Sequence, residues 1–314
     1  MAPRILVIKL GALGDFIQAC GPFMAIRRYH GSAHITLLTT PRFTNLARKS
    51  GWFDEIWIDE RPSWYQLGGW LTFRRRLIEE DFTRVYDLQT SDRSGWYFRQ
   101  FPRRQRPEWS GVVRGCSHPH DNSQRDLMHT IDRQAQQLQV AGIREVDAVC
   151  LDWLDEDIGE FRLSGKIALL VPGGASGRKE KRWPPNLYAG LAQQLMRCGA
   201  QVCLIGDSSE KDLQHSIARD APGVVELAGR TSFAQIARLA RCSYVAVGND
   251  TGPMHIVASC GTPTVVLFGA ASDPALCVPR GPKVVIVEAA PHGRIRNLPG
   301  ISVWEAVKAA RAIA

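Results

Sequence analysis

The sequence predicts an α/β fold built from two Rossmann-like domains that face each other across a cleft. The first observation is a repeated alternation of short apolar runs, typical of buried parallel strands, with longer helical stretches. The second is that this alternation breaks off and starts again after about residue 160. The third is the length of 314 residues, which exceeds what one hydrophobic core usually organises. We therefore expect an N-terminal domain at residues 1–160 and a C-terminal domain at residues 161–314, with a ligand bound between them.

The first half begins with regular alternation and then departs from it. Strands are predicted at residues 4–10, 34–40, 55–60 and 84–89, and helices at 16–30 and 45–51. The segment from 61 to 126 is rich in Trp, Arg and Pro and poor in aliphatic periodicity. It predicts long loops that form an acceptor-binding surface, with a solvated surface carrying half-buried tryptophans as the alternative.

The second half repeats the alternation with more strands. Strands are predicted at residues 166–174, 201–207, 224–229, 244–250, 262–269 and 283–289, and helices at 185–199 and 232–242. The linker between the domains is placed near residues 155–165, and the last helix is a candidate to pack back on the first domain.

Charge and cysteine content narrow the class of protein. Lys and Arg number 39 against 31 Asp and Glu, and residues 93–114 carry six arginines with Glu108 as the one acid. Such a cluster favours an anionic partner, which can be a phosphorylated or carboxylated substrate, a membrane surface or nucleic acid.

The eight cysteines form no CxxC pair, and no apolar stretch resembles a signal peptide or membrane span, so we expect a cytoplasmic protein without structural zinc.

Two loops of the second half have features of an anion-binding site. In "GNDTGPMH", a strand end leads through a polar turn to Pro253, so that helix-start N–H groups from Thr251 to Met254 can receive a diphosphate. In "VPGGASGRKEKRWPP", glycines precede Lys181 and Arg182, which can bind phosphate. The alternatives are a capped turn that binds nothing and a solvated lysine.

Several segments together resemble the bacterial heptosyltransferases, glycosyltransferase family 9. They are "VIKLGALGDFIQACGPFMAIRR", "YDLQTSDRSG", the glycine loop with its lysine, and above all "GNDTGPMHIVASCGTPTVVLFG". The resemblance implies a GT-B fold and an inverting, metal-independent transfer of heptose from an ADP-sugar to the inner core of lipopolysaccharide. It implies no cofactor, because the ADP-sugar is a substrate. It also implies an anionic lipopolysaccharide acceptor at the cytoplasmic face of the inner membrane.

The resemblance assigns roles to particular residues. It implies Asp15 as the general base, with N-capping of the following helix as a compatible second role, and Lys181 as the group that balances the charge of the leaving diphosphate. The donor-binding residues are expected to be Ser176, Glu210, Thr231, Asp250, Thr251, Gly252, Pro253 and His255, with Asp207 as the alternative to Glu210 for the ribose hydroxyls. The acceptor-binding residues are expected to be Gly14, Arg93, Arg103, Arg104 and Arg106, and no residue is expected to bind metal.

Other functions remain open from the sequence. A glycosyltransferase that modifies another glycan or a protein would share this fold, and so would a catalytically silent module that only binds the sugar nucleotide. An oxidoreductase is disfavoured because neither glycine loop contains a full GxGxxG. Nucleic-acid binding is disfavoured because no recognition motif accompanies the arginines.

Overall fold

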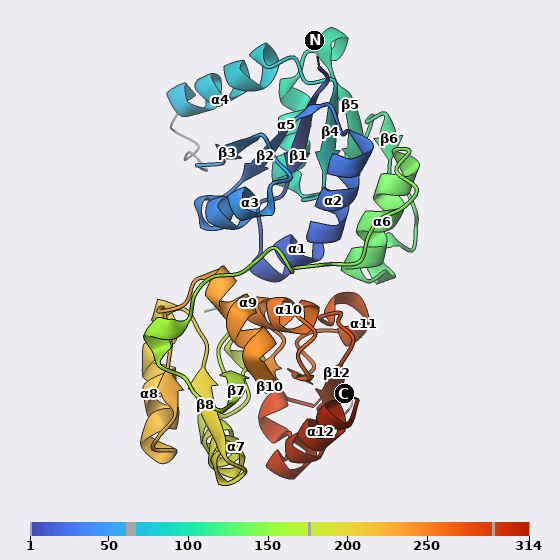
Figure 1. Ribbon diagram of the computed structural model, residues 1–314. Coiled ribbons are helices and arrows are strands. Elements are labelled where there is room, and N and C mark those ends of the chain that lie inside the picture. The colour runs from blue at the N-terminus through green and yellow to red at the C-terminus, as the bar shows by residue number, and fades with distance from the viewer. Residues whose placement is uncertain (1, 61–66, 175–176, 291–292, 314) are drawn as a thin grey trace. The chain divides into compact units, whose positions relative to one another are not determined.

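The computed structural model describes residues 2–60, 67–174, 177–290 and 293–313. The chain divides into two compact units, Met1–Val149 and Cys150–Ala314 (Figure 1). Each unit contains one six-stranded parallel sheet with helices around it, which confirms the predicted α/β fold with two Rossmann-like domains. Each of the ten strands expected from the sequence is present.

The first unit has the doubly wound strand order 3-2-1-4-5-6 of dinucleotide-binding folds. Its strands are β1 (Arg4–Ile8), β2 (His34–Thr39), β3 (Glu55–Ile58), β4 (Arg84–Asp87), β5 (Glu108–Gly111) and β6 (His118–Pro119). The order reverses between β1 and β4, which are adjacent in the sheet. A ligand of such a sheet binds at the carboxyl ends of the strands near this reversal.

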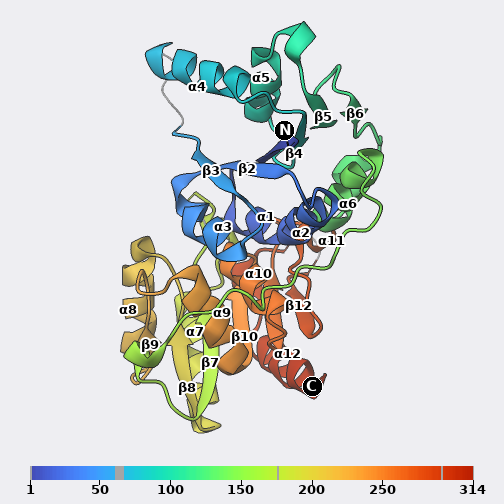
Figure 2. The ribbon, with the colours of Figure 1, turned by 45° about the horizontal axis from the view of Figure 1, so that its top comes forward.

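Helices cover both faces of this sheet. They are α1 (Leu13–Gln18), α2 (Cys20–Tyr29), α3 (Thr44–Ser50), α4 (Leu67–Glu79), α5 (Asp92–Gln100) and α6 (Thr130–Val140), with short 3-10 turns at η1 (Pro41–Phe43), η2 (Arg103–Gln105) and η3 (Arg125–Leu127). In Figure 2 the sheet separates α4 and α5 from α1, α2 and α3. The α4 and α5 side packs on a core that includes Leu6, Ile8, Trp57 and Trp109.

The segment from 61 to 126 contains regular structure where long loops were expected. Its described part forms α4, α5, β5 and β6. The inward side chains of these elements are mostly aromatic: Tyr97, Phe98 and Trp109 are at most 3% exposed, and Trp70 and Phe73 pack against the same core. Aromatic residues thus supply the burial for which the sequence offered no aliphatic periodicity.

The second unit repeats the same strand order. Its strands are β7 (Lys166–Val171), β8 (Ala200–Leu204), β9 (Val225–Glu226), β10 (Ser243–Asn249), β11 (Thr264–Phe268) and β12 (Val284–Glu288), arranged 12-11-10-7-8-9. Its helices are α7 (Pro185–Arg197), α8 (Lys211–Asp220), α9 (Phe233–Cys242), α10 (Gly252–Ser259), α11 (Pro274–Cys277) and α12 (Gly300–Ala312), with 3-10 turns at η4 (Gly159–Phe161), η5 (Lys179–Lys181), η6 (Ser208–Glu210) and η7 (Ile295–Asn297). The last helix, α12, packs against β10, β11 and β12 of its own unit through Val303 and Val307.

The second unit begins about ten residues earlier than the sequence suggested. Leu151 and Leu154 are buried, and the Arg241 guanidinium donates to both of their carbonyl oxygens at 3.3 and 2.5 Å. Arg241 also pairs with Asp155. These contacts fix residues 150–160 to the second unit, which the sequence had placed in the first domain.

Candidate functional site

Asp15 lies in the first turn of α1, directly after the glycine turn that follows β1. Ala12 is the N-cap residue, and its N–H donates to Asp15 Oδ2 at 3.0 Å. The carboxylate therefore stabilises the helix start from the third helical position. Asp15 and Gly14 are both partly exposed, so the capping role leaves them accessible to a ligand.

A pocket of about 600 Å³ opens at the carboxyl ends of β1, β2 and β3 in the first unit. Its lining residues are Leu10, Gly11, Ala12, Leu13, Thr40, Pro41, Arg42, Phe43, Asp59 and Glu60. The β1–α1 turn that leads to Asp15 thus forms one wall of the pocket. This is the edge of a doubly wound sheet at which ligands bind.

Two buried charged residues lie behind Asp15, and the sequence analysis gave neither a role. Lys9 is 4% exposed and its Nζ donates to the Leu88 carbonyl at 3.0 Å. Asp87 is 1% exposed and accepts the N–H groups of Gln89 and Thr90 at 3.1 and 2.9 Å. The signal that could have found them is a charged residue at the end of each of two apolar strands.

The charges around Lys9 are of both signs. Burial lowers the pKa of the Lys9 ammonium, while Asp15 and Asp87 act in the opposite direction. Arg125 and Arg133 add positive charge near the same ammonium. Asp15 therefore lies in a region where a buried cation and two arginines surround the end of β1.

The arginines predicted to bind the acceptor lie in two different places. Arg93 of α5 forms a two-point ion pair with the buried Asp59, at 2.5 and 2.6 Å, and Asp59 lines the pocket. Arg103 and Arg104 are exposed on η2, and the Arg106 guanidinium lies 4.0 Å from the Phe98 ring. Because η2 leads into the first residue of β5, these three arginines lie at the amino-terminal edge of the sheet, opposite Asp15.

In the second unit, one buried amide connects the two loops that were predicted to bind the donor. Asn249 at the end of β10 is fully buried. Its Oδ1 accepts the N–H of Trp183 and the hydroxyl of Tyr188, each at 3.0 Å. Its Nδ2 donates to the carbonyls of Pro172 and Gly173 at 2.8 and 3.0 Å. All hydrogen-bonding positions of the amide are used, so the β7 loop and the start of α7 are fixed relative to β10.

This arrangement brings Lys181 to Asp250. Lys181 Nζ donates to Asp250 Oδ2 at 2.8 Å, and the two side chains are 21% and 8% exposed. Lys181 comes from η5 of the glycine loop, and Asp250 precedes the start of α10. The structure therefore joins the two loops that the sequence analysis selected separately.

The start of α10 offers fewer N–H groups than expected. Thr251 is the N-cap residue, Pro253 has no N–H, and the N–H of Met254 donates to the Thr251 carbonyl at 3.0 Å. This intrahelical bond uses one of the groups that was predicted to receive an anion. The N–H groups of Thr251 and Gly252 remain as candidates, and His255 is buried in the first turn.

Glu210 holds together the loops after β7 and β8. Its carboxylate accepts the N–H groups of Gly174 and Asp207 at 2.7 and 3.1 Å, and burial raises its pKa. A Cβ atom at Gly173 would overlap this carboxylate, which explains the glycine there. Thr231 is partly buried, and its hydroxyl has no hydrogen-bond partner among the described residues. Ser176 lies outside the described residues.

Three further observations concern the molecule around these residues. A second pocket of about 440 Å³ lies at the ends of β11 and β12, and its lining includes none of the residues predicted to bind the donor. Among the described residues, no group of three or more His, Cys, Asp or Glu is placed to hold a metal ion. Within the same part of the chain, no helix has the length and apolar character needed to span a membrane.

Two α/β units of equal strand order form the fold that this chain shares with solved heptosyltransferases of the GT-B class. The chain belongs to glycosyltransferase family 9 (heptosyltransferase), whose sequence profile matches residues 70–295. It is therefore a transferase enzyme.

Known relatives agree with this assignment along nearly the whole chain. Lipopolysaccharide heptosyltransferase 1 of Pseudomonas aeruginosa is 24% identical over 308 residues, covering 85% of this chain and 78% of the relative. The structure of E. coli ADP-heptose lipopolysaccharide heptosyltransferase II is 21% identical with a TM-score of 0.80, covering 98% of both chains. The E. coli heptosyltransferase WaaC, solved with ADP, is 17% identical with a TM-score of 0.75, covering 98% and 99%.

We predict that Asn249→Asp destabilises the second unit. A carboxylate would place oxygen against the carbonyls of Pro172 and Gly173, so two hydrogen bonds would be lost and a buried charge left unpaired. The free energy of unfolding should fall by about 3 kcal/mol or more, as measured by urea denaturation. Asn297→Asp, at an exposed position of the same unit, should change it by less than about 0.5 kcal/mol. Equal stability of both variants would contradict the assigned role of Asn249.

We predict that Asp87 makes the stability of the first unit depend on pH. Burial raises the pKa of Asp87 to about 6, above the value near 3.8 of an exposed carboxyl. The native state then binds a proton that the unfolded state releases, so the free energy of unfolding should decrease as the pH rises from about 4 to about 6.

The variant Asp87→Asn keeps an oxygen acceptor for the N–H groups of Gln89 and Thr90 but cannot ionise. In wild type the free energy of unfolding, measured with urea, should fall by up to about 3 kcal/mol across this pH range, and in Asp87→Asn this fall should be absent. Asp92→Asn, which removes an exposed carboxylate of the same unit, should retain it. An unchanged slope in Asp87→Asn would show that another group is responsible.

Proposed function

We propose that this enzyme transfers a heptose from an ADP-activated donor to the inner core of lipopolysaccharide, with inversion and without a metal ion. The observation that carries the proposal is the Lys181–Asp250 pair at the start of α10, in a chain of the heptosyltransferase family. Relatives named lipopolysaccharide heptosyltransferases, and a similar fold solved with ADP, support this donor and acceptor.

The second unit supplies the donor-binding groups in this proposal. The N–H groups of Thr251 and Gly252 and the Lys181 ammonium bind the diphosphate. Contact of Glu210 with the ribose hydroxyls stays a prediction, and its buried carboxylate already accepts the N–H groups of Gly174 and Asp207. A diphosphate oxygen at Lys181 would share the ammonium with Asp250. Asp250 thus keeps the lysine in place when the donor is absent. Ser176, Thr231, Pro253 and His255 stay predicted members of this site.

The first unit supplies the acceptor-activating group. Asp15 accepts the proton of the acceptor hydroxyl while that oxygen attacks the anomeric carbon of the donor. The bond between the anomeric carbon and the phosphate oxygen breaks, its electrons leave with ADP, and the configuration inverts. The positive charge of Lys9, Arg125 and Arg133 around the end of β1 favours an anionic acceptor at the pocket beside Asp15. Gly14 adjoins this base, and direct acceptor contact by Arg93, Arg103, Arg104 and Arg106 stays a prediction.

The proposal also assigns a place in the cell. Inner-core lipopolysaccharide is built on a lipid, so the enzyme is expected at the cytoplasmic face of the inner membrane as a peripheral protein. The excess of 39 basic over 31 acidic residues suits an anionic membrane surface. A protein of this fold that only bound sugar nucleotides would need no general base. The following variants distinguish such a binding protein from an enzyme.

We predict that Asp15→Asn lowers kcat by about two to four orders of magnitude, as expected for loss of a general base. The asparagine oxygen can still accept the Ala12 N–H, so the fold and the donor affinity should be retained. Transfer from ADP-heptose and thermal stabilisation by the donor measure the two effects. Asp92→Asn, an acidic residue in the first turn of α5, is the matched control with full activity. A kcat within a few-fold of wild type would reduce Asp15 to a helix cap.

We predict that Lys181→Met weakens donor binding and lowers kcat about a hundredfold, because the ammonium balances charge that grows on the leaving diphosphate. Lys179→Met, in the same turn η5 but exposed, should behave as wild type. Transfer should also persist in excess chelator, since Lys181 takes the place of a metal ion. Unchanged kinetics in Lys181→Met, or a strict requirement for a divalent cation, would overturn this part of the mechanism.

A further inference from the structure

The amino-terminal edge of the first sheet carries several exposed arginines. Helices α4 and α5 each lead into a strand, β4 or β5, that starts at this edge. Their last turns and the turn η2 therefore lie at the same edge, on the side opposite Asp15. The exposed arginines of these elements are Arg74, Arg75 and Arg76 of α4, Arg99 of α5, and Arg103 and Arg104 of η2.

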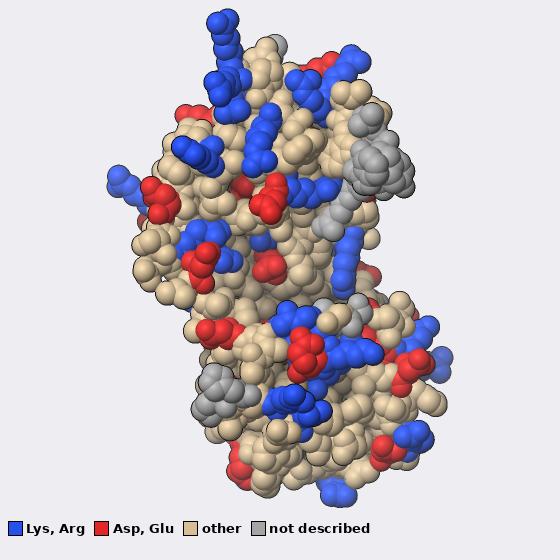
Figure 3. All heavy atoms as spheres, turned by 180° about the vertical axis from the view of Figure 1, so that it is seen from behind, with Lys and Arg blue, Asp and Glu red and all other residues tan. Residues whose placement is uncertain are grey.

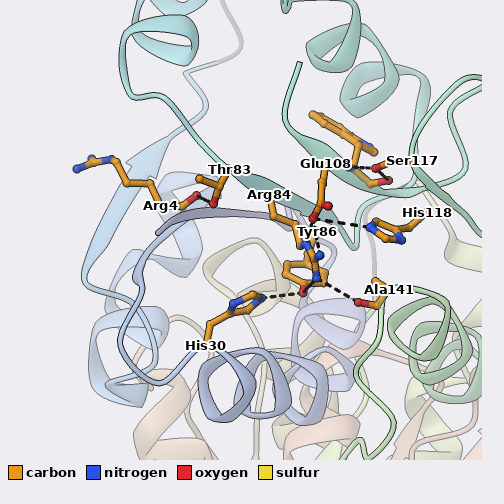
Figure 4. A network of polar contacts seen from close by, with 10 residues as sticks. Arg4, His30, Thr83, Arg84, Tyr86, Glu108, Ser117, His118 and Ala141 are labelled. Atoms are coloured by element: carbon orange, nitrogen blue, oxygen red, sulfur yellow. Dashed lines mark hydrogen bonds and ion pairs between the residues drawn. The ribbon is translucent and has the colours of Figure 1, made fainter. Parts of the chain in front are cut away.

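Some arginines at this edge are already neutralised. Figure 4 shows the Arg84 side chain between Glu108, Tyr86 and the Ala141 carbonyl, with His118 on the far side of Glu108. Arg4 pairs with Glu80, Arg75 with Glu79, and Arg76 with Glu55. These pairs stabilise the sheet edge and the end of α4, and they contribute no net charge to an outside partner.

Four arginines differ from these. Arg74, Arg99, Arg103 and Arg104 are exposed, and none of them forms an ion pair with a carboxylate in the described part of the chain. We call them the edge arginines. Figure 3 shows one face of the molecule, where Lys and Arg side chains alternate with Asp and Glu. The edge arginines depart from this mixed pattern, because their charge is left uncompensated.

The placement of the edge arginines suits an extended surface better than a pocket. Neither of the two pockets described above is lined by any of them. They are spread over the middle of α4, the last turn of α5 and the turn η2, so their guanidinium groups do not converge on a single small anion. Leu71, on α4 with Arg74, is 64% exposed and adds an apolar side chain to the same helix. Exposed arginines with an apolar neighbour are typical of contact with lipid headgroups.

We propose that the edge arginines dock the first unit onto an anionic phospholipid bilayer, with the headgroup phosphates as their ligands. This inference rests on the proposed function in that the acceptor is anchored in the same bilayer. β4 and β5 have four residues each, so the two edges of the sheet are about 13 Å apart. Docking by the amino edge would leave Asp15 on the edge of the sheet that faces away from the headgroups.

Vesicle sedimentation tests the docking surface directly. The wild-type protein should bind phosphatidylethanolamine–phosphatidylglycerol vesicles at low salt, lose binding at high salt, and bind phosphatidylcholine vesicles weakly. At about 1 kcal/mol for each arginine, Arg74→Gln with Arg99→Gln should lower the partition coefficient roughly 30-fold. Both side chains are exposed and unpaired, so the Tm should stay within a few degrees of wild type.

The matched control removes the same charge elsewhere. Arg197→Gln with Arg296→Gln changes two exposed arginines of the second unit and should leave vesicle binding as it is. Equal loss in the control would show that only net charge matters and would overturn the proposal. So would wild-type binding by the Arg74/Arg99 variant.

Transfer kinetics with two kinds of acceptor show whether the edge arginines bind a bilayer or a glycan. With the acceptor embedded in anionic vesicles, the Arg74/Arg99 variant should show a raised apparent KM for the acceptor. With a water-soluble acceptor that lacks acyl chains, its kcat and KM should equal those of wild type. A raised KM for the soluble acceptor would mean that the arginines bind the glycan, and the docking proposal would fall. If wild type transferred no heptose, the proposed function would fail, while sedimentation would still decide the docking surface.

Discussion

Four hydrogen bonds of one buried amide, that of Asn249, determine how the loops at the carboxyl ends of β7 and β10 are held in the second unit. They join the end of β10 to the loop after β7 and to the start of α7. Lys181 lies in the turn just before α7, and Asp250 directly follows Asn249. The ion pair between them can therefore form only if the amide holds both segments in place. The Glu210 carboxylate likewise fixes the loop after β7 to the loop after β8, because it accepts an N–H group from each.

The first unit depends on buried charge instead of a buried amide. Lys9 directly follows β1 and Asp87 ends the adjacent strand β4, where the strand order of the sheet reverses. Their burial is costly unless each finds hydrogen bonds, and Lys9 finds the Leu88 carbonyl while Asp87 finds two backbone N–H groups. Burial lowers the pKa of the Lys9 ammonium, and the nearby carboxylates of Asp15 and Asp87 act against this shift. The charges of Lys9, Asp15 and Asp87 therefore depend on one another.

The sequence predicted the strands and the chemistry-bearing loops, because apolar runs and glycine turns are local signals. It failed for α4, α5, β5 and β6, since Trp70, Tyr97 and Trp109 bury these elements without aliphatic periodicity. It also gave no role to Asn249 or Lys9. The partners of these side chains are 61 to 79 residues away in the chain, so only the folded structure shows them. The position of Arg103 and Arg104 was missed for a related reason, because the edge on which a loop lies depends on the strands before and after it.

The two edges of a parallel sheet differ in their electrostatics, and this chain uses both. Helix N-termini gather at the carboxyl edge, where the positive end of the helix dipole favours Asp15 of α1. Helix C-termini gather at the amino edge, where the negative end favours basic residues such as Arg76 of α4 and Arg99 of α5. An arginine at this edge thus stabilises its helix even when no carboxylate pairs with it. The same topology that places Asp15 on one edge thus leaves arginines on the other edge that their own helices stabilise.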